Sequence, residues 1–238
     1  MKTEGKNAVL ELLKTDKTIE KILLEKNSQG SLGRVFAAAR EKGVRVQFVD
    51  RRALDKESPS GRHQGCIAFS SDYKYSSLQD IINNKGDGGG LVILCDCIED
   101  VHNLGSIIRV AECAGADGVV IQSTNSASVT DAVVRISAGA ANHVKVAKVN
   151  SLNRAVDELK KSGYWLYALE ADGDDIYSVD LTGNVALVIG GEDSGVKKLT
   201  REKCDFVLSL PMKGKVNSLN ASVALGVAVY EVIRKRRK

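Results

Sequence analysis

The chain has 238 residues, of which 43% are hydrophobic and 27% charged, and its formal net charge is only +4. This composition excludes a disordered or low-complexity chain and a membrane protein, and it predicts a soluble protein with either one large domain or, as we favour, a small domain and a medium one.

The cysteines indicate a reducing, cytoplasmic location. Their number is odd, most of them lie in apolar runs, and neither a secretory signal nor a long apolar span accompanies them. The five are Cys66, Cys95, Cys97, Cys113 and Cys204. Cys95 and Cys97 share one side of a predicted strand, but no second pair with zinc-ligand spacing exists. We therefore expect these two cysteines to pack in the core and not to form a metal site.

Positive charge is concentrated at the two ends of the chain. Residues 1–72 carry 14 Lys and Arg against 10 Asp and Glu, and the run 234–238 adds five cations. Residues 73–233 carry 15 basic against 20 acidic residues. A polyanion should therefore bind chiefly to the N-terminal part. The basic C-terminal run is also typical of a helix end that complements the helix dipole.

The first 72 residues predict a small α/β unit. We expect helices over 7–14 and 32–42, strands over 19–24, 44–49 and 66–69, and a loop over 51–65. That loop supplies donors suited to phosphates and base edges, although charged loops also serve solubility. The candidate RNA-binding residues are Arg51, Arg52, Arg62, His63 and Gln64.

Residues 73–89 have the polar, glycine-rich texture of an interdomain connection with one short helix. The expected domains are therefore 1–72 and 90–238. The glycine cluster at 86–90 lacks the Gly-Lys-Ser/Thr ending of a phosphate-binding loop.

From residue 91 onward, apolar strands and helices alternate. Strands are expected at 91–97, 118–121, 144–149, 165–169, 185–189 and 206–210, and helices at 104–114, 127–137, 152–161 and 218–233. This alternation predicts an α/β domain with a mainly parallel sheet covered by helices.

Three strand ends carry concentrated polar residues, at 100–109, 190–195 and 217–222. In an open parallel sheet, ligands bind beyond the carboxyl ends of the strands, so these segments predict one site. Taken singly, each polar residue has an alternative role as a helix or turn cap, with Asn217 or Ser218 as the expected cap of the last helix. Within the assembled site, Ser218 and Asn220 are expected to keep a capping role.

The three segments together resemble the motifs of the SpoU (TrmH-like) family of RNA ribose 2′-O-methyltransferases, within the SPOUT superfamily. The matching residues are Asn103-Leu104-Gly105 with Arg109, the run Gly190 to Gly195, and Leu210-Pro211-Met212 through Ser218-Leu219-Asn220-Ala221-Ser222. The N-terminal part resembles the small RNA-binding domain of ribosomal-protein type found in this family. Within the family, the likeness is greatest to the enzymes that methylate a guanosine of bacterial large-subunit (23S) rRNA.

The resemblance implies a C-terminal domain with a deep trefoil knot, S-adenosylmethionine as methyl donor, and a homodimer with sites at the interface. It implies that the donor is held by Gly190, Gly191, Leu210, Met212 and Leu219. The implied catalytic set is Asn103, Arg109, Glu192, Ser218 and Asn220.

Transfer of a methyl group to a ribose hydroxyl requires in-line placement, removal of a proton and exclusion of water, and it needs no metal. A free guanidine is scarce near neutral pH because the pKa of arginine lies above about 12. We therefore expect Arg109 to position the target and stabilise charge. His102 adjoins Asn103, but the family motif does not demand histidine there, so we expect a solvated or packing role for it.

Two alternatives remain open. One is methylation of a guanosine in transfer RNA, and the other is a non-catalytic RNA-binding or ribosome-assembly protein that has kept the fold.

Overall fold

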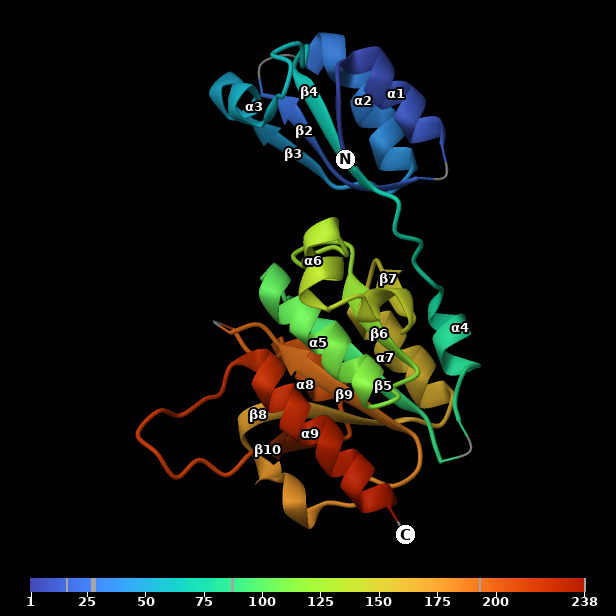
Figure 1. Ribbon diagram of the computed structural model, residues 1–238, viewed down its shortest axis with the longest axis vertical. Helices are drawn as coiled ribbons and strands as arrows, with labels where there is room; N and C mark the ends of the chain where they lie inside the picture. The colour runs from blue at the N-terminus through green and yellow to red at the C-terminus, as the bar shows by residue number, and fades with distance from the viewer. Residues whose placement is uncertain (16, 27–28, 87, 193, 238) are drawn as a thin grey trace. The chain divides into compact units, whose positions relative to one another are not determined.

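The structure is a computed structural model that describes residues 1–15, 17–26, 29–86, 88–192 and 194–237. Contacts divide the chain into two compact units, Met1–Lys74 and Tyr75–Lys238 (Figure 1). Each unit has a sheet and a hydrophobic core of its own.

The first unit is a four-stranded sheet with helices on both faces. Its elements are β1 (Lys2–Glu4), α1 (Lys6–Lys14), β2 (Thr18–Glu25), α2 (Gln29–Glu41), β3 (Val46–Val49), α3 (Arg51–Glu57) and β4 (Cys66–Ser71). The strand order is β1-β4-β2-β3, with only β2 and β3 parallel. Because side chains alternate along a strand, Ile22 and Leu24 of β2 pack with α1 and α2, and Leu23 packs with Leu54 of α3.

Helix α3 corrects the expectation of a continuous loop over 51–65. The segment Arg-Arg-Ala-Leu-Asp-Lys-Glu consists mostly of good helix formers, and its one large apolar side chain, Leu54, is fully buried. A single apolar residue produces no periodicity, so the sequence pattern did not predict this helix. Strand β1 was also not predicted, because it has only three residues.

The second unit confirms the expected α/β architecture. Its six strands are all parallel, in the order β10-β8-β9-β5-β6-β7. The strands are β5 (Leu91–Asp96), β6 (Gly118–Gln122), β7 (Val146–Val149), β8 (Trp165–Asp175), β9 (Val185–Gly190) and β10 (Phe206–Ser209). The helices are α4 (Leu78–Ile82), α5 (Val101–Cys113), α6 (Asp131–Ile136), α7 (Leu152–Lys161), α8 (Lys198–Lys203) and α9 (Ala221–Arg236), with short 3-10 turns at Ala140–Asn142 and Ile176–Ser178.

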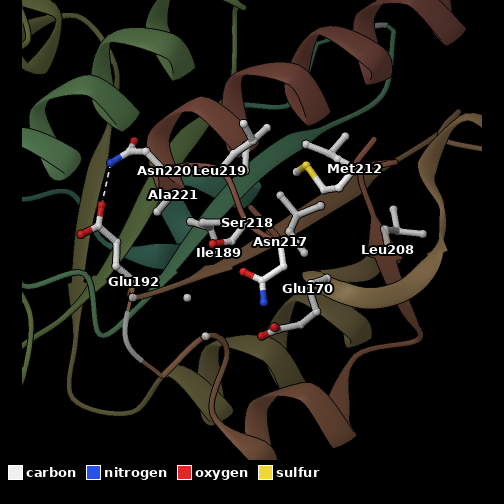
Figure 2. A pocket seen from close by; sticks show the side chains of 17 residues that line it. Glu170, Ile189, Glu192, Leu208, Met212, Asn217, Ser218, Leu219, Asn220 and Ala221 are labelled. Carbon is white, nitrogen blue, oxygen red and sulfur yellow. Dashed lines mark hydrogen bonds between the residues drawn. The ribbon is translucent and has the colours of Figure 1, made fainter. Parts of the chain in front are cut away.

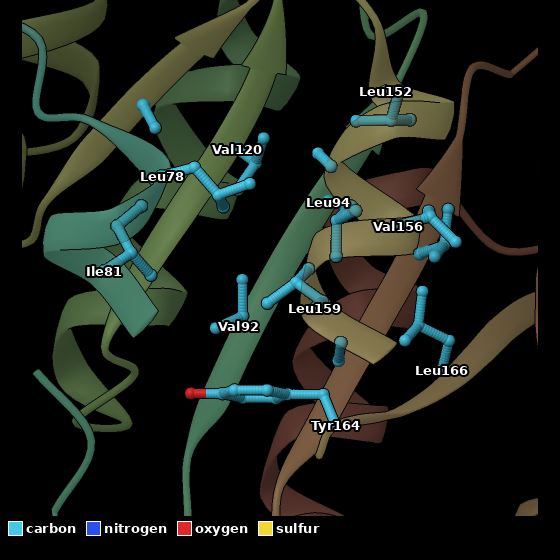
Figure 3. Close-up of a cluster of buried hydrophobic side chains, with 14 of the residues drawn as sticks. Leu78, Ile81, Val92, Leu94, Val120, Leu152, Val156, Leu159, Tyr164 and Leu166 are labelled. Atoms are coloured by element: carbon cyan, nitrogen blue, oxygen red, sulfur yellow. The ribbon is translucent and has the colours of Figure 1, made fainter. Parts of the chain in front are cut away.

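The core of this unit joins β5, β6 and β9 to helices α4 and α7 (Figure 3). Leu78 and Ile81 of α4 pack in the same cluster as Val92 and Val120 of the sheet. Helix α4 thus packs on the second unit, although it lies in the segment expected as a connection. Helices α5 and α9 pack against each other and contact β6 and β9 respectively (Figure 1).

Several elements differ in extent from the expected ones. Helix α6 starts at Asp131 instead of 127, because Thr130 caps it by accepting a hydrogen bond from the N–H of Val133. Strand β8 continues to Asp175, where it pairs with β10. Helix α8 was not predicted, since its sequence KLTREK is short and largely polar.

Candidate active site

The last helix begins at Ala221, and its N-cap is Asn220 instead of Asn217 or Ser218. Oδ1 of Asn220 accepts hydrogen bonds from the backbone N–H groups of Ser222 (3.0 Å) and Val223 (3.3 Å). Capping therefore uses only the oxygen of this side chain. Its amide nitrogen remains able to donate elsewhere.

That amide nitrogen joins the three polar segments into one network. Nδ2 of Asn220 donates to Oδ1 of Asn103 at 2.8 Å. It also donates to Oε1 of Glu192 at 2.6 Å (Figure 2). Nδ2 of Asn103 also donates to Oε1 of Glu192, at 3.0 Å. Residues from the starts of α5 and α9 and from the end of β9 are thus held together. The sequence predicted this meeting, because all three segments follow strands of one parallel sheet.

Asn103 is free to take part because another residue caps its helix. Oδ1 of Asp100 accepts from the N–H groups of His102 (2.7 Å) and Asn103 (2.8 Å). Asn103 itself is only 8% exposed. A buried amide with its partners in place is a fixed part of the site, so a role for Asn103 as a helix cap alone is wrong.

A cavity of about 410 Å³ lies beside this network. Glu192 and Asn220 lie at one end of it, and Leu208 and Met212 lie at the other (Figure 2). The residues expected to hold a cofactor all line it: Gly190, Gly191, Leu210, Met212 and Leu219. Ser218 lines it as well. The cavity therefore combines an apolar slot with a few convergent polar groups, as small-molecule sites do.

Gly190 is required by the way the chain folds back at the end of β9. A Cβ atom on Gly190 would lie 1.9 Å from the carbonyl carbon of Gly195 and 2.2 Å from the nitrogen of Val196. Gly195 has a φ of +59°, which favours glycine. Asp193, which belongs to the same motif, lies outside the described residues.

Glu170 is a site residue that the sequence analysis missed. Pairing between β8 and β10 skips from Ala168 to Asp174, and Glu170 lies in the skipped segment. Its carboxylate accepts a hydrogen bond from the N–H of Val196, lines the cavity, and points toward Asn217 (Figure 2). The available signal was a charged residue directly after the apolar run 165–169, a weaker form of the polar clusters that identified the other three segments.

Arg109 does not join the network. It is exposed on α5, six residues after Asn103, and at about 100° per residue it lies on a different side of the helix. Among the described residues, no hydrogen bond or ion pair holds its guanidinium.

In the first unit, Arg51, Arg52, Arg62 and Gln64 are exposed, but His63 is not. The His63 ring is 1% exposed, with Nδ1 accepting from the N–H of Gly65 (3.0 Å) and Nε2 bonded to the Asp55 carboxylate (2.9 Å). The ring therefore ties the loop to α3, and it is not presented to a ligand as an RNA contact would be.

The cysteines and acidic residues show no sign of metal binding in the part of the chain that the structure describes, where no three metal-ligating side chains cluster. Burial raises the pKa of the Cys66 thiol to about 11 and that of Cys95 to about 12, as expected for cysteines packed in a core. Cys97 differs from the expectation, because β5 ends at Asp96 and Cys97 is only partly buried. Within the described residues, no helix is long and apolar enough to cross a membrane.

Comparison with known proteins identifies the family. The model of the SpoU rRNA methylase family matches residues 90–230, and the model described as RNA 2′-O ribose methyltransferase substrate binding matches residues 3–76. A Bacillus subtilis protein assigned to the TrmH family of tRNA/rRNA methyltransferases is 42% identical over 237 residues, covering 98% of this chain and 94% of its own. The chain therefore belongs to the SpoU rRNA methylase family.

Solved structures share the fold. An S-adenosylmethionine-bound rRNA methyltransferase from Sinorhizobium meliloti superposes with a TM-score of 0.60 at 23% identity, covering 100% of this chain and 88% of that one. A TrmH/SpoU tRNA-modifying enzyme from A. aeolicus superposes with a TM-score of 0.58 at 26% identity, covering 67% of this chain and 80% of that one.

Proposed function

We propose that this protein transfers a methyl group from S-adenosylmethionine to the ribose 2′-hydroxyl of a guanosine in large-subunit (23S) rRNA. The observation that carries the proposal is the cavity of about 410 Å³ closed at one end by the Asn103–Glu192–Asn220 network. Membership of the SpoU family supports the reaction class.

The chemistry of the cavity fits the proposed donor, which supplies a methyl group activated by a positively charged sulfur. Leu210 and Leu219 offer an apolar wall for the adenine ring, and their backbone and that of Gly190 can hydrogen-bond its edge. Glu170 and Glu192 place two carboxylates around the cavity, which complements a cationic ligand.

The proposed catalytic roles follow from the chemistry of each side chain. Arg109 binds the phosphate beside the target ribose with its planar fork and stabilises developing charge. Asn103 and Asn220 hold the Glu192 carboxylate in place through their hydrogen bonds. Ser218 lines the same cavity and orients the attacking hydroxyl.

A homodimer is part of the proposal, because α9 exposes an apolar stripe. Val223, Val227 and Tyr230 are 51%, 37% and 53% exposed and recur at the spacing of one helix face. Such a continuous apolar surface favours a protein interface. Helix α5 packs against α9, so Arg109 would lie close to that interface and serve the site of the second subunit.

The topology and substrate proposals rest chiefly on family likeness. The close crossing at Gly190 and Gly195 is compatible with the trefoil knot that the resemblance implies. Ribosomal RNA is favoured because the rRNA methyltransferase from Sinorhizobium meliloti aligns with 100% of this chain, whereas the tRNA-modifying enzyme aligns with 67%.

We further propose a ribosomal-protein-type RNA-binding domain at 1–72, a linker at 73–89, a methyltransferase domain at 90–238, and a cytoplasmic location.

Calorimetric titration with S-adenosylmethionine tests the proposal. Met212→Glu places a charge against the cavity, whereas Val216→Glu changes a 73% exposed residue in the same loop that does not line it. We expect the wild type and Val216→Glu to bind the donor and Met212→Glu to bind at least about tenfold more weakly. Absence of binding by the wild type would favour a non-catalytic RNA-binding protein.

A further inference from the structure

The first unit exposes two aromatic rings that contact each other. Phe36 of α2 and Phe48 of β3 are 39% and 41% exposed, with ring centroids 5.6 Å apart and an interplanar angle of 46°. Apart from Met1, they are the large hydrophobic residues that the described part of this unit exposes. Because the rings are tilted and not stacked, neither covers the face of the other.

Their position follows from the fold of the unit. Strand β3 is one of the two edge strands of the sheet, and its residue Val46 packs against the core beneath α1 and α2. Phe48 lies two residues further along the same face of the strand, beyond the cover of the helices. On α2, Val35 and Ala39 are buried, and Phe36 lies at the margin of that buried face.

Charge is concentrated on the same elements. Residues 26–62, which include α2, β3 and α3, carry nine Lys and Arg against four Asp and Glu. Residues 1–25 carry five of each, and residues 63–74 carry one of each. All the net positive charge of the unit therefore comes from the segment that carries the aromatic pair.

Several of these cations have no ion-pair partner among the described residues. Lys26 pairs with Asp50 and Arg51 with Glu25, but Arg34, Arg40, Arg45 and Arg52 form no such pair. Arg40 follows Phe36 by four residues on α2, so the two side chains are neighbours on the helix surface. An unpaired arginine beside exposed aromatic rings is a combination with which proteins bind the backbone and bases of single-stranded nucleic acid.

We propose that Phe36 and Phe48 form a stacking platform for unpaired bases of the RNA substrate, with Arg40 binding an adjoining phosphate. The proposal rests on the function proposed above, and it assigns to the first unit the recognition of a single-stranded RNA segment. A stacked base contributes through its ring face, so the platform discriminates by stacking strength and not by base-edge hydrogen bonds.

A second exposed aromatic group in the chain lacks the accompanying charge. Trp165 and Phe206 of the second unit are 54% and 39% exposed, with centroids 5.9 Å apart. Lys160 is engaged in an ion pair with Asp205, the residue that directly precedes Phe206. This group therefore provides a matched control.

Fluorescence anisotropy with the full chain and labelled oligoadenylate or oligouridylate tests the proposal. Phe36→Leu/Phe48→Leu keeps apolar bulk and removes both ring faces, while Phe36→Tyr/Phe48→Tyr keeps them. We expect the leucine variant to lose affinity for oligoadenylate by about fivefold or more, and to lose less for oligouridylate, because adenine stacks more strongly. The tyrosine variant and the control Trp165→Leu/Phe206→Leu should bind like the wild type.

Two further readouts separate stacking from charge and folding. The number of ions released on RNA binding, measured from the salt dependence of the affinity, should be unchanged in the leucine variant. In Arg40→Gln it should fall by about one. Thermal unfolding of each variant confirms that the chain is folded.

Equal RNA affinity of the wild type and the leucine variant would overturn the platform. An equal loss of affinity in the tyrosine and leucine variants would also overturn it. Either result would stand even if the surface then proved to contact a protein. If the wild type methylates RNA while the rings have no effect, the platform alone is wrong. If the wild type neither binds nor methylates RNA, both proposals are wrong.

Discussion

Asn220 shows how one side chain serves both folding and the site. Its oxygen caps α9, and its nitrogen donates to Asn103 and Glu192. The two tasks use different atoms, so they place no conflicting demand on the residue. They can also be separated by substitution.

Asn220→Asp keeps an acceptor for the cap but replaces the two donated hydrogen bonds with a carboxylate facing Glu192. Aspartate caps helices as well as asparagine does, so any loss of thermal stability should come from repulsion by Glu192 and not from the cap. Methyl transfer should fall by at least about tenfold, because like charges at this distance repel. Asn220→Ala should lose both functions, with a stability loss of about 1 kcal/mol. Unimpaired transfer by Asn220→Asp would show that the network has no part in the reaction.

Glu170 provides a test of charge complementarity in the cavity. Glu170→Gln retains an oxygen that can accept from the N–H of Val196 but removes the negative charge. We expect affinity for S-adenosylmethionine, which has a charged sulfonium, to fall by roughly fivefold, corresponding to about 1 kcal/mol. Affinity for S-adenosylhomocysteine, whose sulfur is neutral, should change little. An equal loss for both ligands in calorimetry would contradict an electrostatic role.

At the scale of elements, helix α9 has one end in the site and one face in the proposed interface. Val227 lies in the middle of the exposed apolar stripe. Val227→Arg should therefore convert a dimer into a monomer of 25.5 kDa, measured by sedimentation or light scattering. Transfer should be lost with it, because Arg109 then lacks the second subunit. The control Leu199→Arg changes a 55% exposed residue of α8 and should remain dimeric. A dimeric Val227→Arg protein would show that the interface lies elsewhere.

The elements also show what the sequence can and cannot predict. The strands of the parallel sheet were predicted because strands buried on both faces, such as β9, are continuous apolar runs. Helices α3 and α8 were missed because each is short and mostly charged, and only its burial against a sheet or another helix defines it. Sequence also identified the three polar segments that form the site, since each lies between an apolar strand and the next element of the chain.

The features of the site that the sequence did not predict depend on tertiary geometry. Glu170 faces the cavity because the pairing of β8 with β10 skips several residues, and a skipped register leaves no pattern in one strand. His63 was expected on the surface, but its ring is enclosed by Asp55 and Gly65, which no local pattern indicates. Likewise, the sequence offered Asn217, Ser218 and Asn220 as caps, and the choice of Asn220 depends on where the loop meets Glu192.

For the whole molecule, the two units carry complementary features. The second unit holds the cavity and the hydrogen-bonded network, whereas residues 1–72 carry an excess of four positive charges. This division matches an enzyme that binds RNA with one unit and modifies it with the other. The reaction proposed for that enzyme is the transfer of a methyl group to a ribose hydroxyl.

The most direct test incubates the protein with S-adenosylmethionine labelled in the methyl group and with ribosomal or transfer RNA, and maps the labelled nucleotide. A 2′-O-methyl group blocks alkaline cleavage at that nucleotide, which identifies the position. We predict a single methylated guanosine in large-subunit rRNA for the wild type, and a loss of at least about a hundredfold in Arg109→Ala. No labelled ribose with the wild type, or an undiminished rate in Arg109→Ala, would contradict the account.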